Sequence, residues 1–199
     1  MTIASSLGLL LIVGGSLWQP ARKAPEDAST LYLVHDAKKD LWCGYHEEGA
    51  WRAAIAETRA TETASVDFVK KIPKVVKVTK DDDLGANGWI VFDRYYLNDA
   101  GLVMSLQRAT NVFADDVSRS EILEARNGGH LAVYHVKFRS IQTDSPMTRS
   151  DASFPSLPIT ARLRNFPFGE LIERVREVFA QNSLCVPPRE AMEERAHSR

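Results

Sequence analysis

The sequence predicts an α+β domain in which a curved antiparallel sheet packs against two helices. Residues 74–79 and 130–141 alternate apolar with polar side chains, which is typical of strands that bury one face. Two β-type runs, 89–97 and 102–112, are separated by an Asn-Asp-Ala-Gly turn and predict a hairpin. Apolar side chains recur with helical period over residues 168–181, so we expect a C-terminal helix that covers one face of the sheet.

The first elements of the folded body are expected to start near residue 30. Residues 31–34 and 41–45 are rich in aliphatic and aromatic side chains and predict two short strands. Residues 50–63 are dominated by Ala, Glu and Arg, which favours the first of the two helices.

The middle of the chain carries a helix signal of a different kind. Ser118 and Glu121 have the spacing of a capping box, and the Asn-Gly-Gly at 127–129 is a suitable stop, so a short helix is predicted over 119–126. Residues 143–158 are rich in Ser, Thr, Pro and Asp and predict an exposed loop.

The N-terminal segment bears on where the protein resides. The first eighteen residues carry no charged side chain, and a helix over 3–18 would be about 24 Å long, shorter than a bilayer core of roughly 30 Å. Residues 1–21 therefore favour a secretory signal peptide, with a short membrane anchor as the alternative, followed by a leader at 22–29. Arg22 and Lys23 follow the apolar run instead of preceding it, which opposes export because basic residues favour the cytoplasmic side.

The rest of the chain is expected to form one globular domain over residues 30–186, with a polar tail at 187–199 that frays. If the protein is periplasmic or secreted, its only two cysteines, Cys43 and Cys185, should form a disulfide. Such a bridge closes a loop of about 140 residues and would stabilise the fold by about 4 to 5 kcal/mol in the chain-entropy description. In the cytosol the same residues would be two separate buried thiols, and Cys43 would be a candidate nucleophile.

Charge and motifs exclude several classes of function. The formal net charge of −1 argues against electrostatic binding of nucleic acid or an anionic membrane, so membrane contact is expected only through the N-terminal segment. The chain has neither a Gly-rich phosphate loop nor a G-x-S-x-G elbow, and no cofactor is expected.

Metal-ligating residue types gather near the first cysteine. His35, Cys43, His46 and Glu48 lie within fourteen positions of one another. Their spacing matches no strong zinc pattern, because a single cysteine stands where a knuckle needs a pair. His35, His46 and Glu48 are therefore the candidate ligands, but we expect a solvated loop beside a disulfide and not a metal site.

One carboxylate interrupts the apolar strand at 89–97. Burying Asp93 without a partner would cost several kcal/mol, so we expect it to pair with Arg94 or Arg108. The alternative is that Asp93 and a histidine such as His135 act as acid and base in a sheet-lined pocket of a small hydrolase or isomerase. The favoured expectation is a non-enzymatic exported domain that binds a small apolar ligand or an envelope protein.

Overall fold

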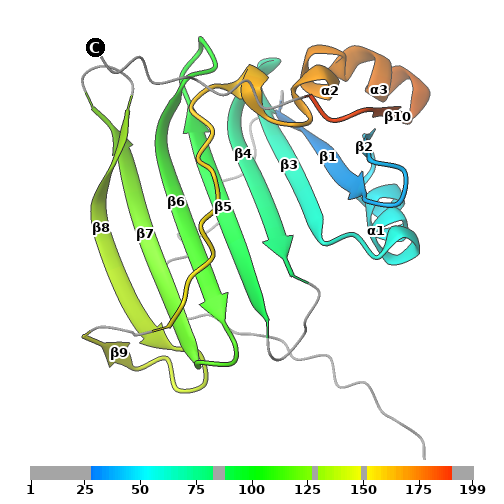
Figure 1. Cartoon of the computed structure of the whole chain (residues 1–199). Helices are drawn as coiled ribbons and strands as arrows, with labels where there is room; N and C mark the ends of the chain where they lie inside the picture. Colours follow the sequence, from blue (N-terminus) through cyan, green and yellow to red (C-terminus); the bar gives the residue numbers. More distant parts are fainter. Residues whose placement is uncertain (1–27, 83–87, 127–129, 149–151, 190–199) are drawn as a thin grey trace, which may run out of the picture.

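The computed structural model of this chain describes residues 28–82, 88–126, 130–148 and 152–189. Within these ranges ten strands form one antiparallel sheet in the order β10-β2-β1-β3-β4-β5-β6-β7-β8-β9 (Figure 1). The strands are β1 (Ala28–Asp36), β2 (Leu41–Tyr45), β3 (Glu62–Val69), β4 (Ile72–Asp81), β5 (Trp89–Leu97), β6 (Val103–Val112), β7 (Val117–Ala125), β8 (Leu131–Ser140), β9 (Pro146–Met147) and β10 (Ser183–Val186).

The helices of the described ranges are few and short. They are α1 (Glu48–Thr58), the 3-10 turn η2 (Leu163–Asn165), α2 (Gly169–Glu173) and α3 (Val175–Gln181). The expected α+β class is therefore wrong, because the described chain is nearly all-β. The antiparallel sheet itself was predicted correctly, but β3, β7, β9 and β10 were not foreseen as strands.

The helix predicted over residues 119–126 is the largest single error. This segment is β7, which pairs with β6 on one side and β8 on the other. Val117, Glu121 and Leu123 are buried on one face of the sheet, while Ser120 on the other face is exposed. Hydrogen bonding to two neighbouring strands and burial of one face outweigh the local capping-box signal.

The C-terminal helix is broken where the sequence predicts a continuous one over 168–181. Arg174 (φ −98°, ψ 20°) lies between α2 and α3, and its backbone departs from helical geometry. Phe168, Leu171, Ile172 and Val178 are all buried, so both halves still present an apolar face to the sheet.

The sheet has two faces with different coverings. The inner face carries the larger core, including Leu31, Val66 and Leu106, and it is covered by η2, α2 and α3 (Figure 1). Among the described elements, α1 covers the outer face at β1 and β2, where it packs Ala54 against Val34 in a small second core. In the part of the chain that the structure describes, no helix covers the outer face of the central strands.

An extended segment, residues 152–161, crosses the inner face in front of β5 and β6, and we call it the strap (Figure 1). The Val103 amide donates to the Ala161 carbonyl (3.0 Å), which fixes the end of the strap to β6. The exposed loop expected at 143–158 is only partly correct. Residues 143–148 are exposed but include the short strand β9, and Leu157 and Phe154 of the strap are half-buried.

The Cys43–Cys185 disulfide predicted from the sequence is confirmed. The two cysteines face each other on β2 and β10, so the bridge ties the C-terminal edge strand to the sheet. A structural disulfide indicates an extracellular or periplasmic location.

The N-terminal segment at 1–21, with most of the leader, lies outside the described residues, as does the tail from residue 190. The sheet begins at Ala28, two residues before the start expected for the folded body. Among the helices of the described ranges, none has the length and apolarity needed to cross a membrane.

Candidate functional site

The register of the sheet gathers charged side chains on the inner face beneath the strap. Asp93 on β5 lies opposite Arg108 on β6, which in turn lies opposite Glu121 on β7. Because side chains alternate between the faces of a strand, the charged residues two positions away share this face. The inner-face charges are Glu62, Lys80, Asp93, Arg108, Arg119 and Glu121.

Asp93 is bound by two partners. The Arg108 Nε donates to its Oδ1 and the Arg108 Nη2 to its Oδ2, both at 2.7 Å, and the Tyr95 hydroxyl donates to Oδ2 at 3.1 Å. Arg108 also donates to the Leu157 carbonyl of the strap (3.2 Å). Of the two arginines expected as partners, Arg108 therefore pairs with Asp93, whereas Arg94 is exposed on the outer face.

Burial controls the ionisation of the partners of Asp93. It raises the pKa of Tyr95 far above its usual value, and the negative charge of Asp93 adds to this effect. Burial opposes the charge of Arg108, but its hydrogen bonds to Asp93 and the Asp93 charge outweigh that and raise the pKa of Arg108. Both partners therefore keep their protons at neutral pH, whereas a general acid or base works best with a pKa near 7.

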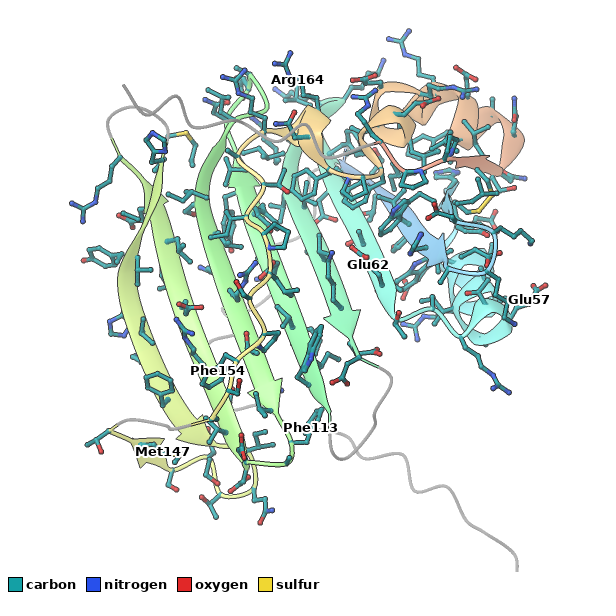
Figure 2. All side chains as sticks on the ribbon, in the orientation of Figure 1. Glu57, Glu62, Phe113, Met147, Phe154 and Arg164 are labelled. Atoms are coloured by element: carbon teal, nitrogen blue, oxygen red, sulfur yellow. A yellow bond between two sulfur atoms is a disulfide. The ribbon has the colours of Figure 1, made fainter. Side chains whose placement is uncertain are left out.

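The other inner-face charges are also paired. The Lys80 Nζ lies 2.5 Å from Glu62 Oε1, and Arg119 pairs with Glu121, which is itself buried. The Arg119 guanidinium lies 5.3 Å from the ring centroid of Phe154 in the strap, and Figure 2 shows Phe154 against the inner face. Three acidic and three basic side chains thus neutralise one another beneath the strap.

A pocket of about 380 Å³ lies between the strap and the inner face, and we call it the strap pocket. This volume is at the lower end of the range typical of small-molecule sites. Glu62, Lys80 and Asp93 line it at the sheet. Its other lining residues are Val78, Tyr95, Leu157, Pro158, Ile159, Thr160, Ala161, Asn165, Phe166, Pro167 and Phe168.

The structure does not bring Asp93 and His135 together. His135 is on β8, and β6 and β7 lie between β8 and β5. Three strand spacings separate the two backbones by about 14 Å. His135 is also exposed on the outer face, opposite Ile122, whereas Asp93 is buried on the inner face.

The three candidate metal ligands lie in separate surroundings. The His35 ring stacks on Trp42 at 5.3 Å between centroids, and the His46 ring lies 4.3 Å from that of Phe179. Glu48 accepts hydrogen bonds from Arg52. Among the residues that the structure describes, no three His, Cys, Asp or Glu side chains are grouped as a metal site requires.

The sequence pointed to only two of the six inner-face charges, Asp93 and Arg108. Arg119 and Glu121 were assigned to a helix, and the Glu62–Lys80 pair depends on β3, which was not foreseen. A signal was present, since β7 alternates Val117, Arg119, Glu121 and Leu123 on one face. That alternation was obscured because its inner-face positions carry charged as well as apolar residues.

Comparisons of this chain with protein-family models, curated proteins and solved structures find no match. The fold and the site therefore define the class by themselves: an open antiparallel sheet, stapled at one end by a disulfide, with a ligand-sized pocket beneath a strap.

Proposed function

We propose that this protein is exported and binds a small apolar ligand in the strap pocket without catalysing a reaction. The observation that carries the proposal is the combination of apolar walls with charges that are already neutralised by neighbouring side chains. Because those charges have partners within the protein, an apolar ligand leaves none of them buried and unpaired.

The walls supply the binding energy. Leu157 and Ile159 come from the strap, and Phe166 and Phe168 from the segment that leads into α2. Ile159 is 41% exposed, so a ligand in the pocket would remove from water both its own apolar surface and that of the Ile159 side chain. An envelope protein is the less favoured ligand, because the dimensions of the pocket are those of a small molecule.

The ionisation of the site favours binding over catalysis. Tyr95 and Arg108 hold their protons at neutral pH, and each of them donates hydrogen bonds to Asp93. A proton-transfer role for Asp93 would require a partner that exchanges protons near pH 7.

Export is supported by two features. The Cys43–Cys185 disulfide is the kind of bond that persists in oxidising compartments, and the uncharged apolar segment at 1–21 has the composition of a signal peptide.

The binding proposal is tested with the uncharged fluorophore N-phenyl-1-naphthylamine, whose emission rises in apolar surroundings. We expect Ile159→Ser to weaken its binding about fivefold, since part of one apolar wall is removed. Phe92→Ser is the matched control: Phe92 is 43% exposed, close to the 41% of Ile159, but lies on the outer face of the sheet. No binding, or equal losses in both variants, would overturn the proposal.

A further inference from the structure

A second pocket, of about 990 Å³, lies where the β3–β4 turn approaches α3, and we call it the basic pocket. It is separate from the strap pocket, and the two pockets have no lining residue in common. Strand β3 contributes Phe68 to the basic pocket and Glu62 to the strap pocket. Its lining residues are Ala28, Ser29, His46, Phe68, Lys70, Lys71, Val175, Arg176 and Phe179.

The cations of the basic pocket have no partners among the residues that the structure describes. Within the described ranges no ion pair or hydrogen bond engages the side chains of Lys70, Lys71 or Arg176, and no carboxylate lines the pocket. This contrasts with the strap pocket, where each charge is neutralised by a neighbour. An uncompensated positive surface attracts an anion.

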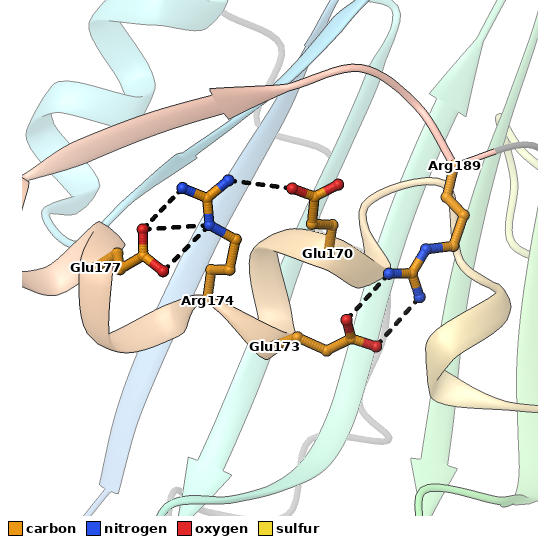
Figure 3. Close-up of polar contacts among 5 residues, drawn as sticks. All are labelled: Glu170, Glu173, Arg174, Glu177 and Arg189. Carbon is orange, nitrogen blue, oxygen red and sulfur yellow. Dashed lines mark hydrogen bonds and ion pairs between the residues drawn. The ribbon is translucent and has the colours of Figure 1, made fainter.

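The neighbouring arginines show that the same helices can neutralise cations when acidic residues are placed near them. Arg174 is bound by Glu170 and Glu177, and Arg189 is bound by Glu173 (Figure 3). Arg176, two residues from Arg174, lines the pocket and has no carboxylate partner within the described ranges.

The two lysines also occupy an unfavourable backbone conformation. Lys70 (φ 51°) and Lys71 (φ 65°) form the two-residue turn between β3 and β4. A turn with positive φ at both positions strongly favours Asn-Gly, and residues with a larger side chain lose stability there. Lysines at both positions weaken the turn, and they add nothing to packing because both are exposed. Their positive charge is therefore the property that a functional role would use.

The base of the basic pocket is apolar. Phe68 is only 3% exposed, and Val175 and Phe179 are half-buried against the main core. A ligand that fills this pocket therefore meets positive charge at the rim and apolar surface below.

We infer that the basic pocket binds the head group of an anionic amphiphile, with a phosphate or carboxylate beside Lys70, Lys71 and Arg176. The first part of the apolar chain packs on Phe68 and Phe179. This site is independent of the strap pocket and does not require the function proposed above.

The first test measures binding of dodecyl phosphate, below its critical micelle concentration, by isothermal titration calorimetry. We expect Arg176→Glu to weaken binding about tenfold and 0.5 M NaCl to weaken it in the unaltered protein, because exposed charges are screened by salt. Arg94→Glu, which reverses an exposed arginine on the outer face, is the matched control and should leave binding unchanged. Equal affinities of the protein and Arg176→Glu would overturn the inference.

The second test separates charge from fold. Lys70→Asn with Lys71→Gly installs the preferred turn, so we expect the double variant to unfold at higher urea concentration while its affinity for dodecyl phosphate falls. A loss of affinity that is due to unfolding would instead be accompanied by lower stability. Unchanged affinity in this more stable variant would contradict the inference.

Further probes identify the part of the ligand that is recognised and its source. Inorganic phosphate should bind much more weakly than dodecyl phosphate, and equal affinity would overturn the role of the apolar base. Vesicles of phosphatidylcholine with and without phosphatidylglycerol distinguish a bilayer lipid from a free amphiphile. If the protein binds the anionic vesicles and Arg176→Glu does not, the head group belongs to a membrane lipid. If the protein binds dodecyl phosphate but neither kind of vesicle, the ligand is a soluble amphiphile. Phe92→Ser, at a residue that lines neither pocket, should change none of these affinities.

Discussion

The Arg108 guanidinium binds the Asp93 carboxylate through two parallel hydrogen bonds of 2.7 Å, across neighbouring strands of the sheet. Their side chains are only 10% and 7% exposed, so water screens the pair little. Because Arg108 also donates to the Leu157 carbonyl, one side chain joins β5, β6 and the strap. The ion pair therefore holds the wall of the strap pocket in place.

Replacing Arg108 with leucine should strongly destabilise the protein. In Arg108→Leu the Asp93 carboxylate keeps only the Tyr95 hydroxyl as a side-chain partner, and removing one member of a buried pair typically costs about 3 to 5 kcal/mol. The free energy of unfolding, measured with urea at pH 7, should fall by this amount.

The double variant Asp93→Leu with Arg108→Leu is the informative comparison. It removes both charges, so it should be more stable than Arg108→Leu alone. Arg174→Leu, which breaks an exposed pair on α2 and α3, should lose far less stability. If Arg108→Leu and Arg174→Leu unfold at the same urea concentration, the Asp93–Arg108 ion pair does not stabilise the fold more than an exposed pair does.

Tyr95 should make stability depend on pH on the alkaline side. Burial, followed by the charge of Asp93, raises its folded-state pKa above the ordinary value of 10.0. The phenol therefore stabilises the fold fully below about pH 10, and this contribution is lost as the pH rises toward the folded-state pKa, since only the unfolded chain readily releases the proton. Tyr95→Phe cannot ionise.

The stability difference between the protein and Tyr95→Phe should consequently shrink above pH 10. Between pH 7 and 9 the variant should be less stable by about 1 to 2 kcal/mol, because it lacks the hydrogen bond to Asp93 but keeps the ring packed on Phe166. Urea unfolding at several pH values measures the difference. A difference that stays constant to pH 11 would show that the Tyr95 pKa is not raised.

Gly169 should not tolerate a side chain. A Cβ atom at this position would lie 2.7 Å from the Arg164 carbonyl oxygen, a backbone atom that cannot move without displacing η2. Gly169→Ala should therefore lower the free energy of unfolding by about 1 to 3 kcal/mol.

Gly49→Ala provides the control of opposite sign. A Cβ atom on Gly49, in the first turn of α1, would meet nothing within 4 Å. Since alanine favours a helix over glycine, this change should stabilise the protein by about 0.5 to 1 kcal/mol. Thermal unfolding of the two variants compares them directly, and similar shifts in Tm would contradict the close approach at Gly169.

Removing the disulfide should weaken the whole fold. It joins residues 142 positions apart, and Cys43→Ser with Cys185→Ser should cost about 2 to 5 kcal/mol. Thiol labelling of the denatured protein should find no free thiol before reduction and two after it. Two free thiols in protein recovered from the cell envelope would show that the bridge is not formed there.

Local sequence signals were sufficient where a segment pairs with its neighbour in the chain. The hairpin of β5 and β6, the alternation of β8 and the positions of β1 and β2 could all be predicted, because short turns and period-two patterns are local properties. β7 could not be predicted, because the local spacing of Ser118 and Glu121 favours a helix. Its strand conformation depends on hydrogen bonds to β6 and β8 on either side.

The candidate site was predicted only in part for the same reason. A buried carboxylate needs a partner, so the place of Asp93 within an apolar strand was enough to match it to one of two arginines, Arg94 or Arg108. Register decided the rest: it placed Arg119 and Glu121 in the same inner-face cluster, and it placed His135 three strands away on the outer face.

The sequence by itself determined that Cys43 and Cys185 would pair in an oxidising compartment, that the chain would build an antiparallel sheet, and that Asp93 would need a cation. Each of these follows from residue chemistry or from local periodicity. The tertiary structure alone decided that β7 is a strand, that the strap covers the inner face, and that Lys70, Lys71 and Arg176 surround one pocket. These features depend on contacts between residues far apart in the chain, which no local pattern encodes.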